Sequence, residues 1–137
     1  MSEIKVDNLT GKTSAGDITV TSEGGAATMQ LQQGLAKAWV NFDGTVPSLT
    51  DSFNIASVAD YGTGDHQVNL SNSMSNGDYS LDGSCSSDAA SANIGVTFQN
   101  NTTPPTSSLF RLITRRRDNN TNYDNGYVYA KAHGDLS

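Results

Sequence analysis

From Trp39 onward, short runs that alternate apolar with polar residues are separated by clusters of Gly, Pro, Asn, Asp and Ser. A period of two places successive side chains on opposite faces of a strand. The runs are Trp39–Phe42, Ser52–Val58, His66–Leu70, Tyr79–Cys85, Ile94–Phe98, Leu109–Thr114 and Tyr127–Ala132. About seven strands at this spacing predict an antiparallel β-sandwich or barrel over residues 39–137.

The composition is typical of a mainly β chain with a modest core. Ser, Thr, Asn and Gly make up about two-fifths of the residues, whereas Lys and Glu number four and two. Tight turns and strands favour this mixture, and long surface helices do not. Ile, Leu, Val and Phe supply just under a fifth of the chain. Because small domains bury a lower fraction of their surface alone, we expect partner subunits to provide part of the burial.

Charge and cysteine content exclude several functional classes. A formal net charge of −6 and a pI near 4.5 argue against a nucleic-acid partner held by phosphate contacts. Cys85 is the single cysteine, so an intrachain disulfide framework is excluded. The first residues, MSEIKVDN, lack the apolar core of a signal peptide, and no run approaches membrane-spanning length. We therefore expect a protein made in a cytosol, without membrane insertion.

Residues 1–25 have the pattern of an attachment arm. Glu3–Leu9 alternates, and the alternation resumes at Ile18 and Val20 after the turn-rich segment Gly11–Asp17. Two short strands joined in this way predict a hairpin or an extended arm. Such a pair is marginal in water by itself, so it should dock onto neighbouring copies or a larger assembly. The expected attachment residues are Ile4, Val6, Ile18 and Val20.

Residues 26–38 carry the one helical stripe of the sequence. Ala27, Leu31 and Leu35 recur at spacings of four, followed after three or four residues by Ala38 or Trp39, which places them on one helix face. Gly34 costs about 1 kcal/mol relative to Ala, so the predicted short helix would not persist in isolation. It could lie on the β-domain or form the seam of a three-chain bundle around a common axis. The thin core favours the bundle, with Leu31, Leu35 and Trp39 at the trimer interface.

No motif predicts catalysis or a bound metal. Asp60, Asp65 and Asp78 lack the spacing of the best-known calcium loop, and turn chemistry explains the DYGTGD segment more simply. His66 and His133 lie far apart, and neither has a neighbouring Cys or Ser–Asp pair. We therefore expect no catalytic residue, no metal and no cofactor, and the protein is predicted not to be an enzyme.

Arg115–Arg117 is the single basic cluster. Successive residues on a strand point to alternate faces, so the three guanidinium groups cannot form one flat patch. They could pair with nearby aspartates or a neighbouring subunit, or contact acidic saccharide or capsid carboxylates. The loops 86–93, 99–108 and 118–126 are the expected receptor-facing surface, with Arg116, Asn119 and Tyr123 as candidate contacts. The five tyrosines, Tyr61, Tyr79, Tyr123, Tyr127 and Tyr129, suit glycan stacking or a protein interface equally well.

Three ordered pieces of the sequence carry a resemblance to a known module. They are KAWVNFDGT at 37–45, DSFNI at 51–55, and GTGD at 62–65 followed by VNL at 68–70. Together they resemble a module that recurs in tail-fibre and other virion structural proteins of tailed bacteriophages, particularly marine ones. The likeness covers roughly Leu35–Leu81 and is looser beyond.

The resemblance implies a homotrimer on the surface of a virion, with no catalysis. Since the module follows Met1 by only about thirty residues, the chain is expected to be a short fibre or spike rather than the end of a long shaft. Its expected partners are itself, other phage virion proteins of the capsid or tail, and a host-surface glycan. The alternative is a capsid decoration (cement) protein that braces the head. A glycan-active enzyme is a third hypothesis, for which no suitable carboxylate pair is evident.

Overall fold

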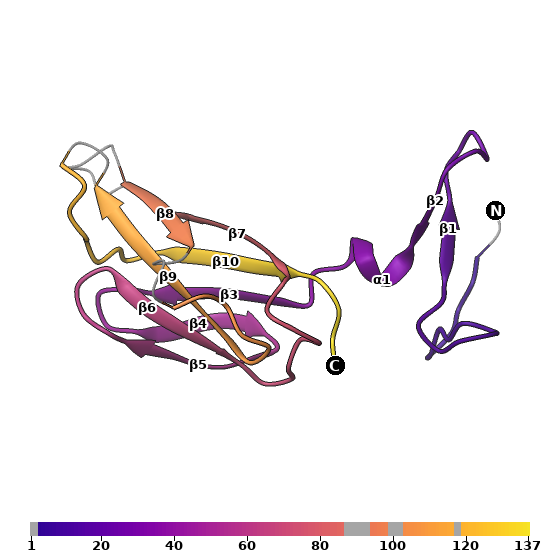
Figure 1. Cartoon of the computed structure of the whole chain (residues 1–137), viewed down its shortest axis with the longest axis horizontal. Coiled ribbons are helices and arrows are strands. Elements are labelled where there is room, and N and C mark those ends of the chain that lie inside the picture. The colour runs from indigo at the N-terminus through magenta and orange to yellow at the C-terminus, as the bar shows by residue number, and fades with distance from the viewer. Residues whose placement is uncertain (1–2, 87–93, 99–102, 117–118) are drawn as a thin grey trace. The chain divides into compact units, whose positions relative to one another are not determined.

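The computed structural model describes residues 3–86, 94–98, 103–116 and 119–137, with the backbone alone over most of 94–98. Strands make up 46% and helix 3% of the chain, so the mainly β fold class is confirmed. The chain divides into two compact units, Met1–Leu35 and Ala36–Ser137. Each unit has its own sheets, coloured from indigo to yellow along the chain in Figure 1.

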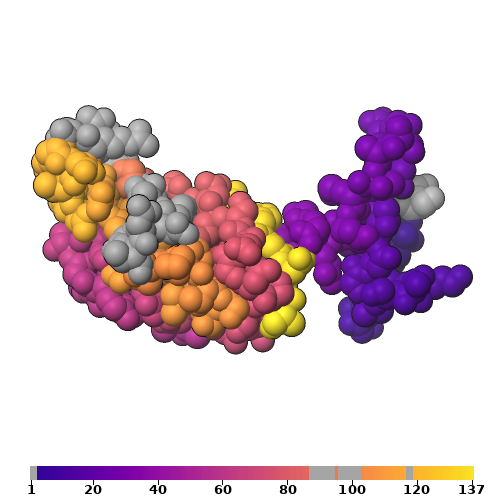
Figure 2. All heavy atoms as spheres, viewed as in Figure 1, coloured from indigo at the N-terminus to yellow at the C-terminus, as the bar shows by residue number. Residues whose placement is uncertain are grey.

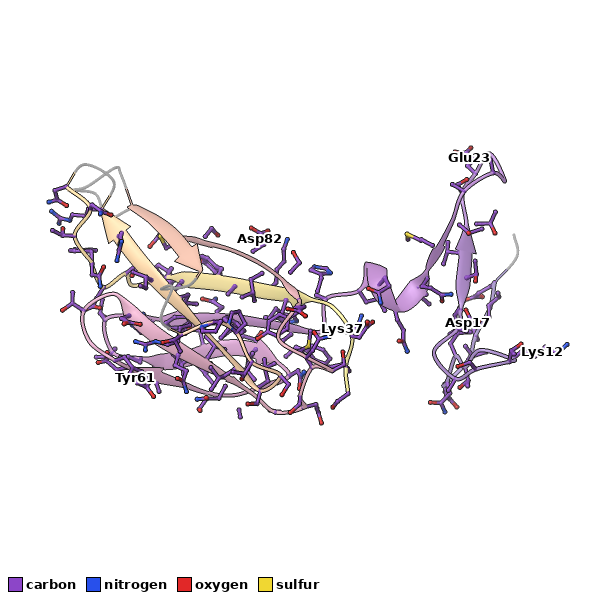
Figure 3. The ribbon with its side chains drawn as sticks, in the orientation of Figure 1. Lys12, Asp17, Glu23, Lys37, Tyr61 and Asp82 are labelled. Carbon is purple, nitrogen blue, oxygen red and sulfur yellow. The ribbon has the colours of Figure 1, made fainter. Side chains whose placement is uncertain are left out.

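The first unit is built on a two-stranded antiparallel sheet. β1 (Thr19–Thr21) pairs with β2 (Thr28–Gln30), and Val20 lies opposite Met29. The connecting loop closes with a bond from the Ser22 amide to the Ala27 carbonyl of 2.8 Å. Figure 3 shows Lys12 and Glu23 projecting from two loops of this unit.

Of the two forms predicted for Glu3–Leu9 and Ile18–Val20, a hairpin or an extended arm, the hairpin is wrong. Residues 3–9 form no strand, and β1 pairs with the segment that follows it. The reason lies in the intervening loop, where the Gly11 amide bonds to the Ala15 carbonyl and the Asp17 amide to the Ser14 carbonyl. The loop thus uses its polar backbone groups locally, and β-branched Thr19, Val20 and Thr28 favour the strand pair that forms instead.

The helix predicted over residues 26–38 is also wrong in extent. Only α1 (Leu31–Gly34) is helical, without a side-chain cap at its start, and Leu35 already has extended geometry. Thr28–Gln30 is held in β2, and the backbone from Ala38 belongs to the sandwich. One helical turn gains too few internal hydrogen bonds to compete with these strands. The four residues of α1 are too few to form the predicted three-chain helical bundle.

The second unit is a sandwich of two four-stranded antiparallel sheets (Figure 1). One has the order β4-β3-β10-β7 and the other β5-β6-β9-β8. Within the described residues the sheets close no barrel, so the sandwich is the alternative that the chain adopts. The strands are β3 (Ala38–Asp43), β4 (Ser48–Phe53), β5 (Ile55–Asp60), β6 (Asp65–Leu70), β7 (Ser80–Cys85), β8 (Ile94–Phe98), β9 (Leu109–Arg116) and β10 (Val128–His133).

The core lies between the two sheets. Alternate residues of β3, β6, β9 and β10 point inward, and Phe42, Phe110 and Leu112 are essentially inaccessible to solvent. Each such side chain contributes about 1.5–3 kcal/mol through burial. In the space-filling view, the magenta part of the second unit, which includes β5 and β6, adjoins its orange part, which includes β9, and the sheet order pairs β6 with β9 (Figure 2). The buried cluster comprises Ala38, Val40, Phe42, Val68, Leu70, Met74, Phe110, Leu112, Val128, Ala130 and Ala132.

Asn54 carries the chain from one sheet to the other. It is the single residue between β4 and β5, and its φ of 57° lies in the left-handed region that Asn tolerates better than most residues. Its Nδ2 donates to the carbonyls of Lys37 and Asn72 at 3.0 and 3.1 Å, and its Oδ1 accepts from the Asn72 amide at 2.7 Å. These bonds hold the corner and thereby the stacking of the two sheets.

Candidate functional site

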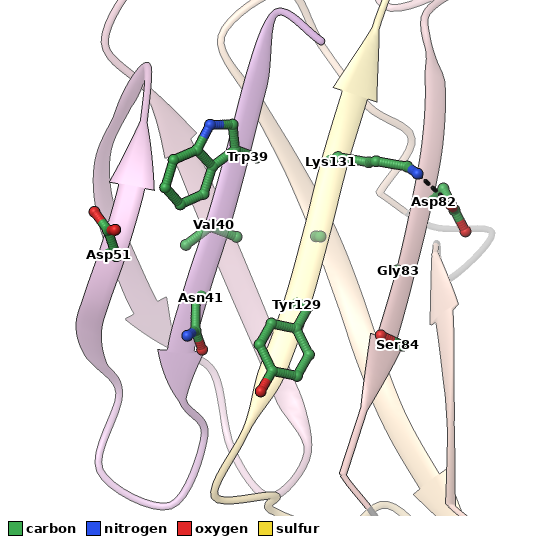
Figure 4. Close-up of a pocket in the computed structure, with 10 residues that line it drawn as sticks. Trp39, Val40, Asn41, Asp51, Asp82, Gly83, Ser84, Tyr129 and Lys131 are labelled. Atoms are coloured by element: carbon green, nitrogen blue, oxygen red, sulfur yellow. Dashed lines mark ion pairs between the residues drawn. The ribbon is translucent and has the colours of Figure 1, made fainter.

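An open groove lies on the outer face of the β4-β3-β10-β7 sheet (Figure 4). Its volume is about 480 Å³, within the range of roughly 300–1,000 Å³ typical of small-ligand sites. Trp39 and Tyr129 come from the two central strands, and polar side chains come from all four strands. The lining residues are Trp39, Val40, Asn41, Asp51, Asp82, Gly83, Ser84, Tyr129, Ala130 and Lys131.

Strand alternation directs these side chains outward. In β3 the residues 38, 40 and 42 are buried, so Trp39 and Asn41 face away from the core. In β10 the residues 128, 130 and 132 are buried, so Tyr129 and Lys131 face the same side. The Ala130 side chain points into the core, so only its backbone lies on the outer face between Tyr129 and Lys131.

The register arranges the outer face in two rows across the sheet. Lys131 lies opposite Trp39 on one side and Asp82 on the other. In the next row, Tyr129 lies opposite Asn41 and Ser84. The rows extend onto β4, where Phe53 pairs with Trp39 and Asp51 with Asn41. An aromatic ring and hydrogen-bonding groups thus occur in each row.

The aromatic rings of this face remain accessible to solvent. Trp39 is 38% exposed, Tyr129 41% and Phe53 53%. Such large apolar side chains are usually covered, and an exposed cluster of them marks a surface that contacts another molecule. The neighbouring polar residues prevent this surface from being a plain hydrophobic patch.

The charges of the groove are two carboxylates and one ammonium group. The Lys131 Nζ lies 3.1 Å from the Asp82 Oδ2, and both side chains are exposed to solvent. The hydrogen bond and positive charge of Lys131 lower the pKa of Asp82 below its usual value. Asp51 accepts a hydrogen bond from the Ser52 amide at 2.8 Å. Because Lys131 is paired with Asp82, the groove has an acidic balance.

Asn41 has an unsatisfied polar atom between the two rings. Its Oδ1 is enclosed and accepts no hydrogen bond from any residue that the structure describes. Figure 4 shows this side chain beside Tyr129 on the groove surface. Enclosed side-chain oxygens nearly always have a partner, and one that lacks it costs about 1–3 kcal/mol. Because this oxygen is closed to solvent, it would meet a groove ligand only after the Asn41 amide turned about its terminal torsion.

The predicted trimer-interface residues do not share one helix. Leu31 belongs to α1, Leu35 follows its end, and Trp39 lies on β3 in the second unit. Leu35 is 54% exposed and Leu31 is half-buried. The helical stripe that joined these three residues is therefore wrong, whereas their participation in an interface stays a prediction.

The predicted attachment residues all lie in the first unit. Ile4, Val6 and Val20 are exposed, and Ile18 is half-buried. Ile4 and Val6 precede β1, while Val20 lies within it. Their contact with a virion stays a prediction.

The structure brings two of the candidate receptor-facing residues into contact. The Arg116 guanidinium lies over the Tyr123 ring, 4.5 Å from its centre, and the Arg116 amide bonds to the Thr121 carbonyl. Asn119 lies in the same loop, where its Oδ1 accepts from Thr121. These side chains thus order the loop.

The other arginines of the cluster differ in environment. Arg115 donates to Asn122 at 2.8 Å, whereas Arg117 lies outside the described residues. Of the expected receptor-facing loops, residues 87–93, 99–102 and 118 also lie outside them. Arg111, which the sequence did not single out, pairs with Asp65 and covers the Tyr61 ring at 4.3 Å. No sequence signal distinguished this pair from other charges.

His66 is a core residue. It is completely buried, its Nε2 lies 3.1 Å from the Gly44 carbonyl, and its ring meets Phe42 edge-on at 5.2 Å. Asp60 and Asp65 frame the β5–β6 turn, where the Gly62 amide bonds to Asp60 at 2.8 Å and the Tyr61 amide to the Asp65 carbonyl at 2.9 Å. The turn chemistry expected of DYGTGD is therefore present.

Two features are absent from the described parts of the chain. No cluster of three or more His, Cys, Asp or Glu side chains could hold a metal ion there. Nor is any helix in those parts both long and apolar enough to span a bilayer.

Comparisons with known proteins do not extend this picture. No protein-family model, no curated protein and no solved structure matches the chain. The groove must therefore be interpreted from its own residues.

Trp39 was predicted at a trimer interface and Tyr129 was one of five tyrosines suited to stacking or an interface, but the other groove residues were not predicted as a site. The alternation at Tyr127–Ala132 already placed Tyr129 and Lys131 on one face. The missing information was the strand order, because β10 lies between β3 and β7 although more than forty residues separate it from each of them. Sequence periodicity defines faces of strands and not neighbours of strands.

Proposed function

We propose that this chain is a non-enzymatic structural protein of a tailed-phage virion. It acts as a homotrimeric fibre or spike, anchored by its first unit, and displays its second unit for host-surface attachment. The resemblance over Leu35–Leu81 motivates the phage assignment, and the two-unit organisation supports a division between anchoring and display.

The observation that carries the proposal is the exposure of apolar residues in the first unit. None of its described residues is buried, and Ile4, Val6 and Met29 are 85%, 59% and 57% exposed. A segment without a core gains little from the hydrophobic effect by itself. These side chains become protected when the unit docks onto a partner, and virion proteins are the partners that the resemblance implies.

The second unit has the complementary property. Eleven of its described apolar residues are buried in one cluster, and this core allows the unit to fold by itself. It can therefore remain exposed on a particle while the first unit is held. The outward groove and the loops at the sheet ends are the surfaces that such a display makes available.

Removal of the first unit tests the proposal. A chain lacking residues 2–35 should keep the β-sheet circular dichroism and cooperative unfolding of the sandwich but lose binding to particles that lack the protein. Lys12→Ser, a polar change on an exposed loop of the first unit, is the control and should bind normally. A truncated chain that still binds those particles would contradict the proposal.

The location of the bound chain distinguishes a fibre from capsid decoration. Labelling of intact particles and electron microscopy should place the chain at the tail or at a few sites. Dense labelling over the head would instead identify a decoration protein that uses the same anchoring unit.

A further inference from the structure

We propose that the groove between Trp39 and Tyr129 binds an uncharged saccharide. The inference deepens the proposed host-surface attachment and rests on it for its biological setting. Its physical basis is independent, because it depends only on the second unit. It also places the ligand on the outer sheet face rather than at the basic cluster of Arg115–Arg117.

The two aromatic rings match one part of a saccharide. One face of a sugar ring consists mainly of C–H groups, which are slightly positive and pack against the negative face of an aromatic ring. Trp39 and Tyr129 provide such rings on neighbouring strands, and both are about two-fifths exposed. The groove volume of about 480 Å³ accommodates a small ligand of this kind.

The polar groups match the hydroxyl groups of a saccharide. Hydroxyls both donate and accept, and the groove offers mainly acceptors, the carboxylates of Asp51 and Asp82. Lys131 on β10 and Ser84 on β7 supply donors beside Asp82. The Asn41 oxygen adds an acceptor without a partner, and the broad terminal torsion of its amide can turn it toward a bound hydroxyl.

The charge balance selects the class of saccharide. Two carboxylates face one ammonium group that is already paired at 3.1 Å, and the whole chain has a formal charge of −6. Sulfated, phosphorylated or carboxylated sugars would be repelled by this surface. An uncharged glycan loses nothing to repulsion, so it is the occupant that the electrostatics favour.

A second copy of the chain fits this face less well. The centres of protein interfaces are depleted in charged residues. Here Asp51, Asp82 and Lys131 line the groove with the two rings, and covering them would desolvate the Lys131–Asp82 pair and leave Asp51 in need of a specific partner. Solvated hydroxyl groups satisfy such side chains without a complementary protein surface.

Fluorescence provides a direct test, because Trp39 is the only tryptophan in the chain. The full-length protein is titrated with uncharged hexasaccharides of glucose, mannose, galactose and N-acetylglucosamine, and with sulfated counterparts. We expect a saturable change in tryptophan emission with at least one uncharged sugar and none with the sulfated sugars. Tyr129→Ala should weaken that binding by about tenfold or more. Tyr129→Phe, which retains the ring, should bind within about threefold of the unchanged protein.

Tyr61→Ala is the matched control, since Tyr61 is also exposed but does not line the groove. It should leave the affinity unchanged. Three results would overturn the inference: no response to any uncharged sugar, a preference for sulfated sugars, or equal loss in Tyr61→Ala and Tyr129→Ala. An emission change on concentrating the protein alone, with no sugar response, would assign the face to a second copy. If the chain bound a sugar but did not associate with particles, the proposed virion function would be refuted and the saccharide site would be supported.

Discussion

Single positions show how the same residue type acquires different environments in this chain. Asp82 and Asp43 both have a lowered pKa, but for different reasons: the hydrogen bond and charge of Lys131 act on Asp82, whereas the Thr45 hydroxyl and amide donate to Asp43. Both carboxylates are exposed to solvent. The pair therefore separates the effect of a charged neighbour from that of local hydrogen bonds.

Replacing Lys131 should change one of these carboxylates and not the other. In Lys131→Gln, the pKa of Asp82 should rise toward its ordinary value, because the ammonium group that stabilises the carboxylate is gone. The pKa of Asp43, measured in the same carboxyl NMR titration, should not move. Because the pKa of Asp82 is lower in the folded than in the unfolded chain, it stabilises the fold at a pH above the unfolded-state pKa, and this contribution is lost as the pH falls through the folded-state pKa. The contribution is small because the pair is exposed to solvent. Equal shifts at both aspartates would contradict the assignment of the Lys131 effect.

Tyr79 should make folding stability sensitive to alkaline pH. Burial raises its pKa from 10.0 to about 12, and its hydroxyl lies 3.1 and 3.0 Å from the carbonyls of Thr106 and Leu109. Between these two pKa values, tyrosine ionises in the unfolded chain and stays protonated in the folded one. The unfolded state is thus favoured, and the free energy of unfolding should fall as pH rises from 10 to 12.

Tyr79→Phe isolates this contribution from the other titrating groups. At neutral pH the free energy of unfolding of Tyr79→Phe should be about 1 kcal/mol lower than that of the unchanged protein, because the hydroxyl hydrogen bonds are lost. Its urea unfolding midpoint should then fall less between pH 10 and pH 12 than that of the unchanged protein. Parallel curves for the two proteins would show that Tyr79 does not titrate differently on folding.

At the scale of elements, the sandwich depends on a corner between its two sheets and a tight turn within one of them, both of which the backbone must be able to form. β4 passes into β5 through Asn54 alone. The β5–β6 turn uses Gly62 and Gly64, both with positive φ, and the Gly64 amide donates to Asp124. A Cβ at Gly64 would meet the Thr114 carbonyl oxygen at 2.5 Å, so this turn packs too closely for any other residue.

Substitution of Asn54 should destabilise the sandwich. Asn54→Ala forces a left-handed conformation on alanine and removes the bonds to Lys37 and Asn72, which together should cost about 2–4 kcal/mol. Asn54→Gly retains the backbone freedom and should cost about 1–2 kcal/mol through the lost bonds alone. Urea denaturation measures both values. If glycine were as costly as alanine, backbone strain would have no part in the effect.

At the scale of the whole molecule, the two units differ in how they can be stabilised. Ala36–Ser137 encloses a core, whereas the described residues of Met1–Leu35 bury none of their side chains. The exposed apolar residues of the first unit also make it the expected site of self-association. Oligomerisation there no longer rests on a long helix, because α1 is a single turn.

A charge in the first unit should therefore prevent assembly. The full chain should sediment as a trimer at micromolar concentration, and Leu35→Asp should sediment as a monomer because it places a carboxylate in the interface. Val46→Asp is the control, since Val46 is exposed to 64% in the second unit and should leave the trimer intact. If the unchanged protein were a monomer, the predicted trimer would not exist. If Leu35→Asp were still a trimer, Leu35 would not lie in the trimer interface.

Sequence periodicity determined the features of this protein that depend on residues close together in the chain, namely the faces of its strands and its tight turns. The alternation at Trp39–Phe42 and Tyr127–Ala132 sorted the side chains onto two faces, one of which the structure buries, and DYGTGD predicted a turn that the structure contains. These features depend on strand geometry and turn chemistry, which act over a few residues. The mainly β class follows from the same short-range pattern.

Tertiary structure alone decided which strands meet and which competing pattern prevails. The spacing of Leu31 and Leu35 suits a helix, but the pairing of β1 with β2 and the start of β3 leave one helical turn between them. Likewise, Trp39 and Tyr129 are ninety residues apart in sequence and become neighbours because β10 inserts beside β3. Such long-range pairings depend on burial summed over the whole sandwich, and no local pattern encodes that sum.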